Sequence, residues 1–293
     1  MFYNLAMNTN IASIGSMAWE VWQHDQIGRV IGVTSRGLFL AIEPRVLFVS
    51  FERWRGPLTI NLDQSIDQLR AMDVGAEAVF SNARLIFPAT ELSLSASSAA
   101  VWQASLPVSA PGPIDQRIHT LKQIANIVTS RALVRGFAPF LAPLLDLPTS
   151  GPLSTEQAAV LSVLRALRQA QRDHDMPAMQ DNINRLLGYG NGLTPSGDDC
   201  VLGFLLMLNR WQANRDWHHL NQAGIDAAYQ KTTNLSANLI ECAAQSTADE
   251  RLLMVADGIA TRSASIDECV ECVLDWGNSS GIDALTGMAL AFS

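Results

Sequence analysis

GNGLTPSGDD, residues 190–199, leads directly into the apolar stretch 200–208. A second block, GNSSGID at 277–283, is also followed by apolar residues. In each block a glycine-containing loop runs into Ser-Gly-x-Asp. Because a Ser with an acidic residue three positions later, ahead of an apolar run, resembles a capping box, both blocks predict the start of a helix. Together they predict a pair of helix N-termini in the C-terminal part of the chain.

The first block allows two assignments of its helix start. With Ser196 as N-cap, Asp199 is the third helical residue. With Thr194 as N-cap, Pro195 takes the first helical position, where the missing N–H costs nothing. Both assignments leave unpaired backbone N–H groups that carry about half a positive charge. Since glycines also let a ligand approach the backbone, the paired blocks predict a site for a small anionic or strongly polar ligand.

A third cluster of small hydroxyls, TTNLS at 232–236, lies between the two blocks at another expected helix entrance. Such hydroxyls can orient a carboxylate or an amide. We expect the carboxylates Asp198, Asp199 and Asp283 to be the catalytic groups, which orient ligand amides or cap the loops. The expected ligand-binding residues are Gly190, Asn191, Gly192, Thr194, Ser196, Gly197, Thr232, Thr233, Ser236, Asn278, Ser279, Ser280 and Gly281.

Two adjacent carboxylates such as Asp198 and Asp199 could ligate Mg²⁺. Consecutive helical residues point about 100° apart, however, and rarely share one ion. We therefore predict no metal and no other cofactor, with Mg²⁺ kept as the alternative. The sequence also gives no nucleophile elbow and no order of residues typical of a Ser-His-Asp triad. An enzyme of this kind would act by positioning and electrostatic stabilisation.

The composition of the chain limits its partners and its surroundings. Twenty basic against twenty-eight acidic residues give a net charge of −8, without a Lys/Arg cluster suited to a phosphate backbone, so nucleic acid is not an expected partner. The first twenty residues hold no Lys or Arg, and the apolar stretch 200–208 is too short to span a bilayer. We expect a cytoplasmic protein without membrane association, whose four cysteines are reduced.

Short apolar runs separated by Gly, Pro, Asn and Asp dominate the N-terminal part of the chain. This spacing predicts an antiparallel sheet that closes into a small barrel or a sandwich. The segment 11–23 before it is compatible with either a helix or a strand. The runs lie at 30–33, 38–42, 46–51, 58–62, 78–80, 85–87 and 92–94.

The proline-rich stretch 107–113, PVSAPGP, suits neither a helix nor a strand interior, so we place a domain boundary there. The predicted domains are a β-rich domain, 1–110, and an all-α domain, 111–293, which makes the fold class α+β. The apolar segment 136–148 is interrupted by prolines and is predicted as a buried loop, in preference to a lid or a subunit contact. The expected helices cover 114–131, 154–170, 178–187, 199–212, 217–231, 235–244, 249–261, 266–276 and 283–291.

Two further patterns are interpreted as structural. Cys269 and Cys272 have the C-x-x-C spacing but lie on one expected helix without a second pair or a nearby His, which favours buried structural thiols. His218 and His219 lack partners at helical spacing and are expected at the surface.

The blocks at 190–203, 232–236 and 279–287 resemble, in the same order, three signatures of the AllH family, long catalogued as a domain of unknown function. AllH is one subunit of a bacterial oxamate carbamoyltransferase of allantoin breakdown. With the β-rich N-terminal half, the resemblance covers most of the chain. Many members have His where this chain has Asn278, so the resemblance gives no support for proton transfer at that position.

The resemblance implies a multisubunit enzyme that exchanges oxalurate and phosphate with oxamate and carbamoyl phosphate. These ligands are small anions or planar amides, which helix N-termini and hydroxyls can bind without a basic patch. The expected partners are a small anionic metabolite and other protein subunits, a second copy of the chain, or both. The alternative is a non-catalytic subunit that binds a metabolite or acts as a scaffold, and a third interpretation is a purely structural pair of capped helices.

Overall fold

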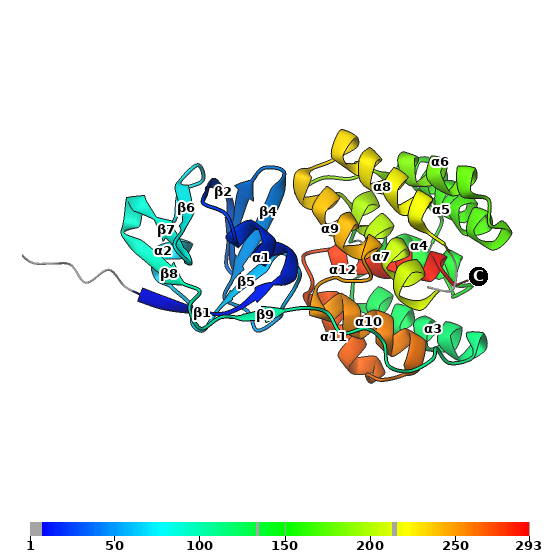
Figure 1. The fold of residues 1–293 in the computed structure, drawn as a ribbon. Helices are drawn as coiled ribbons and strands as arrows, with labels where there is room; N and C mark the ends of the chain where they lie inside the picture. Colours follow the sequence, from blue (N-terminus) through cyan, green and yellow to red (C-terminus); the bar gives the residue numbers. More distant parts are fainter. Residues whose placement is uncertain (1–7, 133–134, 150, 213–215, 293) are drawn as a thin grey trace, which may run out of the picture. The chain divides into compact units, whose positions relative to one another are not determined.

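Figure 1 shows the fold in a computed structural model that describes residues 8–132, 135–149, 151–212 and 216–292. The chain divides into two compact units after Ser105. This division lies just before the proline-rich stretch 107–113, in which no helix or strand is formed within the described residues. The first unit is rich in strands and the second consists of helices, so the α+β class is confirmed.

The strands of the first unit form a closed barrel. Their order is β5-β4-β3-β2-β6-β7-β8-β1, and β1 also pairs with β5, which closes the ring. β9 pairs with β1 alongside this ring. The strands are β1 (Asn8–Gly15), β2 (Gln26–Thr34), β3 (Gly37–Ile42), β4 (Arg45–Ser50), β5 (Thr59–Leu62), β6 (Glu77–Ser81), β7 (Arg84–Phe87), β8 (Leu92–Ser95) and β9 (Ala100–Trp102).

The expectation of a purely antiparallel sheet is wrong in part. β1 runs parallel to β8 and to β9, and β4 runs parallel to β5. Consecutive strands joined by short turns, such as β2–β3, β3–β4 and β6–β7, are antiparallel. The exceptions involve β1, which pairs with strands distant in sequence, and the longer connection 51–58, which lets β5 return in the direction of β4. Hydrophobic spacing finds strands but does not fix the direction of such non-local pairs.

The segment 11–23, left open by the sequence, contains both structures. β1 ends at Gly15 and the short helix α1 (Ser16–Trp22) follows at once. A Cβ at Gly15 would lie 2.0 Å from the carbonyl oxygen of Gly56, so the close approach of the two backbone segments requires glycine. The other helical turns of this unit are α2 (Asp67–Arg70) and the 3-10 turn Pro88–Thr90.

The second unit is built from helices around a buried central pair. α7 and α12 pack on each other, and every residue of α7 except Ser196 and Asn209 is buried. In Figure 1, α12 (red) and α7 lie between α8 and α9 on one side and α3, α10 and α11 on the other. The helices are α3 (Ile114–Arg131), α4 (Ala138–Leu144), α5 (Thr155–Asp173), α6 (Met176–Leu186), α7 (Ser196–Trp211), α8 (His218–Lys231), α9 (Asn234–Ala244), α10 (Glu250–Thr261), α11 (Ile266–Asp275) and α12 (Ser280–Leu290).

The predicted buried loop within 136–148 is in part a helix, α4, and this corrects the sequence interpretation. Pro139 lies in the first helical turn, where a missing N–H removes no hydrogen bond, and Pro143 is the only proline deeper in this seven-residue helix. A helix this short loses little from one absent donor. Its burial is as expected, because Phe140, Leu141 and Leu144 are 0–3% exposed.

Glycines bring the backbones of α7 and α12 into direct contact. A Cβ at Gly203 would lie 1.9 Å from the carbonyl oxygen of Ala284, and a Cβ at Gly287 would lie 1.8 Å from that of Cys200. Such distances are far below van der Waals contact, so any side chain at either position would push the helices apart.

No helix in the described part of the chain is long and apolar enough to cross a membrane.

We expect Gly203→Ala to reduce the free energy of unfolding by at least about 2 kcal/mol, because the added methyl group meets rigid backbone instead of a side chain that can move. Gly287→Ala should have a similar effect. Urea denaturation followed by circular dichroism measures the change.

The matched control is Gly224→Ala in α8, where the added Cβ would meet nothing closer than Leu205 Cδ1 at 3.7 Å. This substitution should be neutral or stabilise the chain by about 0.5–1 kcal/mol, since Ala is the better helix former. Equal effects of the three substitutions would contradict the proposed backbone contact.

Candidate functional site

The two Ser-Gly-x-Asp blocks begin helices α7 and α12, but neither is a capping box. Ser196 and Ser280 are the first helical residues, and Pro195 and Ser279 occupy the N-cap positions without a side-chain cap bond to any described residue. Both assignments from the sequence, Ser196 or Thr194 as N-cap, are therefore wrong. Asp199 and Asp283 fall on the fourth helical position, at the end of the first turn.

Asp199 and Asp283 each lie beside one hydroxyl of their own block and one hydroxyl of the other block. Thr194 Oγ1 and Ser280 Oγ are 3.2 Å apart, and both hydroxyls lie beside the Asp199 carboxyl. The hydroxyls of Ser196 and Ser279 lie beside the Asp283 carboxyl. We call this set the paired-motif cluster: Thr194, Ser196, Asp199, Ser279, Ser280 and Asp283.

The backbone N–H groups at the two helix starts are largely occupied, which corrects the expectation of unpaired donors. Gly197 N donates to Tyr189 O at 2.8 Å, and Gly281 N donates to Trp276 O at 2.9 Å. The next two N–H groups of each helix donate to Pro195 O and Ser279 O, respectively, at 2.9–3.2 Å. These amides already bind carbonyl groups of the same chain, so they are not free to hold an anion.

Glycine at the second helical position has a packing role in both helices. A Cβ at Gly197 would lie 2.0 Å from Leu186 O, and one at Gly281 would lie 2.0 Å from Val273 O. Each helix start therefore presses on the last turn of the helix before it, α6 or α11. This contact requires glycine whether or not a ligand binds nearby.

Asp198 is held by donors from two other segments. Its Oδ1 accepts a hydrogen bond from Gly188 N at 2.6 Å, its Oδ2 accepts one from Thr232 Oγ1, and the buried Ser236 hydroxyl lies beside it. Burial raises the pKa of Asp198, and these donors oppose the rise. Thr233 caps α9 by accepting from Ser236 N at 3.1 Å. The structure thus brings the hydroxyl cluster 232–236 to the first block through Asp198.

Asp199 and Asp283 are the most unusual groups of the cluster. They are 1% and 0% exposed, and the Oδ2 atom of each is buried without a hydrogen-bond partner among the described residues. Burial raises the pKa of Asp199 well above its usual value, and the nearby Asp283 charge raises it further. Burial also raises the pKa of Asp283 to about 6. The two carboxyl groups therefore resist being ionised together.

The sequence interpretation did not include the segment just before α4 in the site. Phe137 N donates to Asp283 Oδ1 at 2.5 Å. Gly136, with φ of +48°, lies so close that a Cβ there would be 2.2 Å from the same oxygen. A glycine directly before an apolar segment is the only signal in the sequence that marks this contact, and it is a weak one.

The remaining predicted ligand-binding residues lie on the outer side of the loops. Asn191 and Asn278 are exposed, and the carbonyl oxygen of Asn278 accepts a hydrogen bond from Arg135 Nη1 at 3.5 Å. Gly190 and Gly192 have φ of +117° and +100°, which other residues rarely adopt, so they shape the first loop. Their predicted roles in ligand binding stay predictions.

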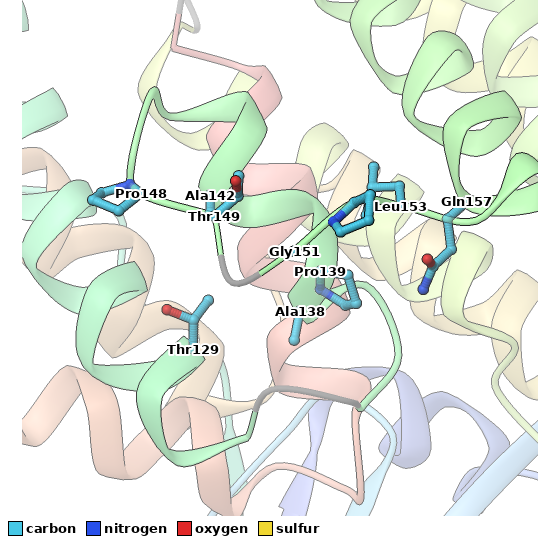
Figure 2. A pocket seen from close by; sticks show the side chains of 10 residues that line it. Thr129, Ala138, Pro139, Ala142, Pro148, Thr149, Gly151, Leu153 and Gln157 are labelled. Atoms are coloured by element: carbon cyan, nitrogen blue, oxygen red, sulfur yellow. The ribbon is translucent and has the colours of Figure 1, made fainter.

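A surface cavity of about 220 Å³ lies beside α4 and is separate from the paired-motif cluster. Its lining side chains carry no charge, and Figure 2 shows them on α3, on α4, on the connection to α5 and on the first turn of α5. The cavity thus offers few groups for recognition of a charged ligand. It is lined by Thr129, Ala138, Pro139, Ala142, Pro148, Thr149, Gly151, Pro152, Leu153 and Gln157.

The cysteines and the His pair lie as expected. Cys269 and Cys272 are buried free thiols on α11, and burial raises their pKa values to about 12 and about 11, so they are protonated. His218 and His219 are exposed. Among the described residues, no group of three or more His, Cys, Asp or Glu side chains could hold a metal ion.

The paired-motif cluster, Asp198 and the cluster 232–236 all fall within one stretch of the chain, from the end of α6 through α12. Residues 186–292 match the family model of oxamate carbamoyltransferase subunit AllH. The resemblance seen in the motifs is thereby confirmed for this stretch, while the barrel, α3 to α5 and all of α6 except Leu186 lie outside the match. Comparisons with curated proteins and with solved structures gave no match. AllH itself is named as a subunit of oxamate carbamoyltransferase.

The raised pKa of Asp283 predicts a pH dependence of stability. The folded chain binds this proton more tightly than the unfolded chain, so the stabilisation is complete below the usual value of 3.8 and is lost as the pH rises through about 6. In the presence of EDTA, we expect Asp283→Asn to lose less stability than the wild type between pH 4 and pH 7, by about 2 kcal/mol. Urea denaturation at a series of pH values measures the difference.

Asn keeps an oxygen for the Phe137 N–H, so the substitution removes the charge and leaves this hydrogen bond in place. The control is Asp226→Asn at an exposed position of α8, which should keep the wild-type pH profile. If Asp283→Asn also kept that profile, the buried carboxyl would ionise as freely in the folded chain as in the unfolded one.

Proposed function

We propose that this chain is a subunit of a carbamoyltransferase complex of the oxamate carbamoyltransferase type. In this proposal the paired-motif cluster binds a small anion that bears an amide, such as carbamoyl phosphate or oxamate. The observation that carries the proposal is the coincidence of two findings. The family match spans residues 186–292, and the polar cluster that these residues build is assembled from both ends of the match.

The hydroxyls of the cluster are the groups through which a ligand would be bound. Thr194, Ser196, Ser279 and Ser280 are half-buried, whereas Asp199 and Asp283 lie fully buried beneath them. Hydroxyls can both donate and accept hydrogen bonds, which suits phosphate oxygens, carboxylates and amides alike. In this proposal Asp199 and Asp283 lie beneath these hydroxyls and help to position the ligand. Asp198 acts indirectly, because its oxygens are bound to Gly188 and Thr232.

One observation favours the alternative of an accessory subunit. The first-turn amides and Asp198 are bound to groups of the same chain, as expected of a cluster whose task is to hold α6, α7, α9, α11 and α12 together. In that case the chemistry of the complex takes place on a partner chain. A substitution in the cluster would then change assembly and stability, but not the catalytic step.

The test uses the complex purified through a tag on this chain. The assay follows formation of carbamoyl phosphate from oxalurate and phosphate. We expect Ser280→Ala to lower kcat/KM by about 10- to 100-fold, because a hydroxyl that binds the reacting ligand is removed while the fold is kept. Asp226→Asn on the surface of α8 should leave kcat/KM unchanged.

Each outcome decides between the two roles. Full activity in a complex that contains Ser280→Ala and Asp283→Asn chains would reject a catalytic site here and support the accessory role. A wild-type complex without carbamoyl transfer would reject this reaction for the chain altogether. A thermal-shift measurement with carbamoyl phosphate, oxamate and phosphate on the same chains reports binding independently of turnover.

A further inference from the structure

The paired-motif cluster contains two buried carboxyl groups that no basic side chain accompanies. Asp199 and Asp283 are buried next to each other, and neither forms an ion pair with any described Lys, Arg or His. Buried charges in proteins are paired, bound to a metal ion or neutralised by a proton, because an isolated one costs many kcal/mol. Either a retained proton or a bound cation must therefore neutralise the two carboxyl groups.

The oxygens that would receive it are identifiable. Asp199 Oδ2 and Asp283 Oδ2 are buried without a partner among the described residues, while the other Asp283 oxygen is occupied by Phe137 N–H. The adjacent carboxylate Asp198 differs, since both of its oxygens accept hydrogen bonds from the chain. The free oxygens thus belong to a pair that spans α7 and α12, and not to the neighbours Asp198 and Asp199.

The surrounding groups favour a hard cation. Next to the two carboxylates lie the hydroxyls of Ser196 and Ser280, each contributed by the opposite helix. A set made only of oxygens suits Mg²⁺, Ca²⁺ or Mn²⁺, and Mg²⁺ in particular is commonly bound by one or two carboxylates with water completing its shell.

We propose that Asp199 and Asp283 bind one divalent cation, of the Mg²⁺ type, between their unpartnered oxygens, with the hydroxyls of Ser196 and Ser280 beside it. The site connects the first turns of α7 and α12. It departs from the prediction of no metal, and also from the Asp198–Asp199 pair that the sequence suggested as the Mg²⁺ alternative. The cation site does not depend on the proposed carbamoyltransferase function.

The cation would also explain how an anion can approach two carboxylates, and this part rests on the proposed function. Without the ion, the paired-motif cluster repels an anionic ligand. With it, the local charge is neutral and a ligand oxygen can contact the metal above the half-buried hydroxyls. Binding of phosphate or carbamoyl phosphate should then require the divalent ion.

The test is a titration of the isolated full chain with Mn²⁺ at pH 7.5 after treatment with EDTA, followed by electron paramagnetic resonance of the free ion. We expect one Mn²⁺ to bind per chain and Mg²⁺ to displace it. Asp199→Asn and Asp283→Asn should each weaken binding by at least about tenfold, whereas Asp226→Asn should bind as the wild type does. In thermal unfolding, 10 mM Mg²⁺ should raise the Tm of the wild type by about 3–6 °C and leave both site variants unchanged.

Absence of Mn²⁺ binding by the wild-type chain would overturn the proposal whatever the variants do. A shared proton would give a different pattern, in which Mg²⁺ leaves the Tm of the wild type unchanged at pH 7.5. That pattern would also overturn it. Since these measurements use no substrate, a failure of carbamoyl transfer in the complex leaves their outcome unaffected.

Discussion

The direct backbone contact between α7 and α12 is the constraint on which the helical unit depends. Gly203 and Gly287 remove the side chains that would separate the helices, and each helix then rests on a carbonyl group of the other. This approach brings the two first turns together, so that hydroxyls of one block reach the carboxyl of the other. The close packing of α7 on α12 therefore also assembles the polar cluster.

The electrostatics of this cluster differ from those of a simple anion site at helix N-termini. In such a site, free amides and the helix dipole attract negative charge. Here the amides are bound within the chain, and the dipoles instead face carboxyl groups that the protein has buried itself. The cluster therefore has buried carboxyl groups at its base and half-buried hydroxyl groups above them.

The sequence predicted the positions of helices and strands better than the pairing and packing between them. Helical spacing located the helices after residue 113, and short apolar runs located the barrel strands, because both are local patterns. The direction of β1 and β5 depends on partners far along the chain, and no local pattern reports it. Likewise, α4 forms despite Pro143 because packing on α12 and neighbouring helices outweighs a weak propensity.

The same limit applies to the site. Unusual loops beside acidic residues can be recognised from the sequence alone. The motifs therefore identified Thr194, Ser196, Ser280, Asp199 and Asp283. They could not show that Ser280 faces Asp199, because this contact depends on how two helices cross. Nor could they show the Phe137 N–H, which is a backbone group and leaves no trace in residue type.

The hairpins α6–α7 and α11–α12 present nearly equivalent groups to each other, as if related by a local two-fold axis. If the paired-motif cluster were perfectly symmetric, it would bind an asymmetric ligand in two opposite orientations with equal energy. The segment before α4 breaks this degeneracy, because Phe137 donates to Asp283 and Asp199 has no equivalent donor among the described residues. This one hydrogen bond thus makes the two otherwise matching carboxyl groups different. The two orientations of an asymmetric ligand in the paired-motif cluster are therefore no longer equal in energy.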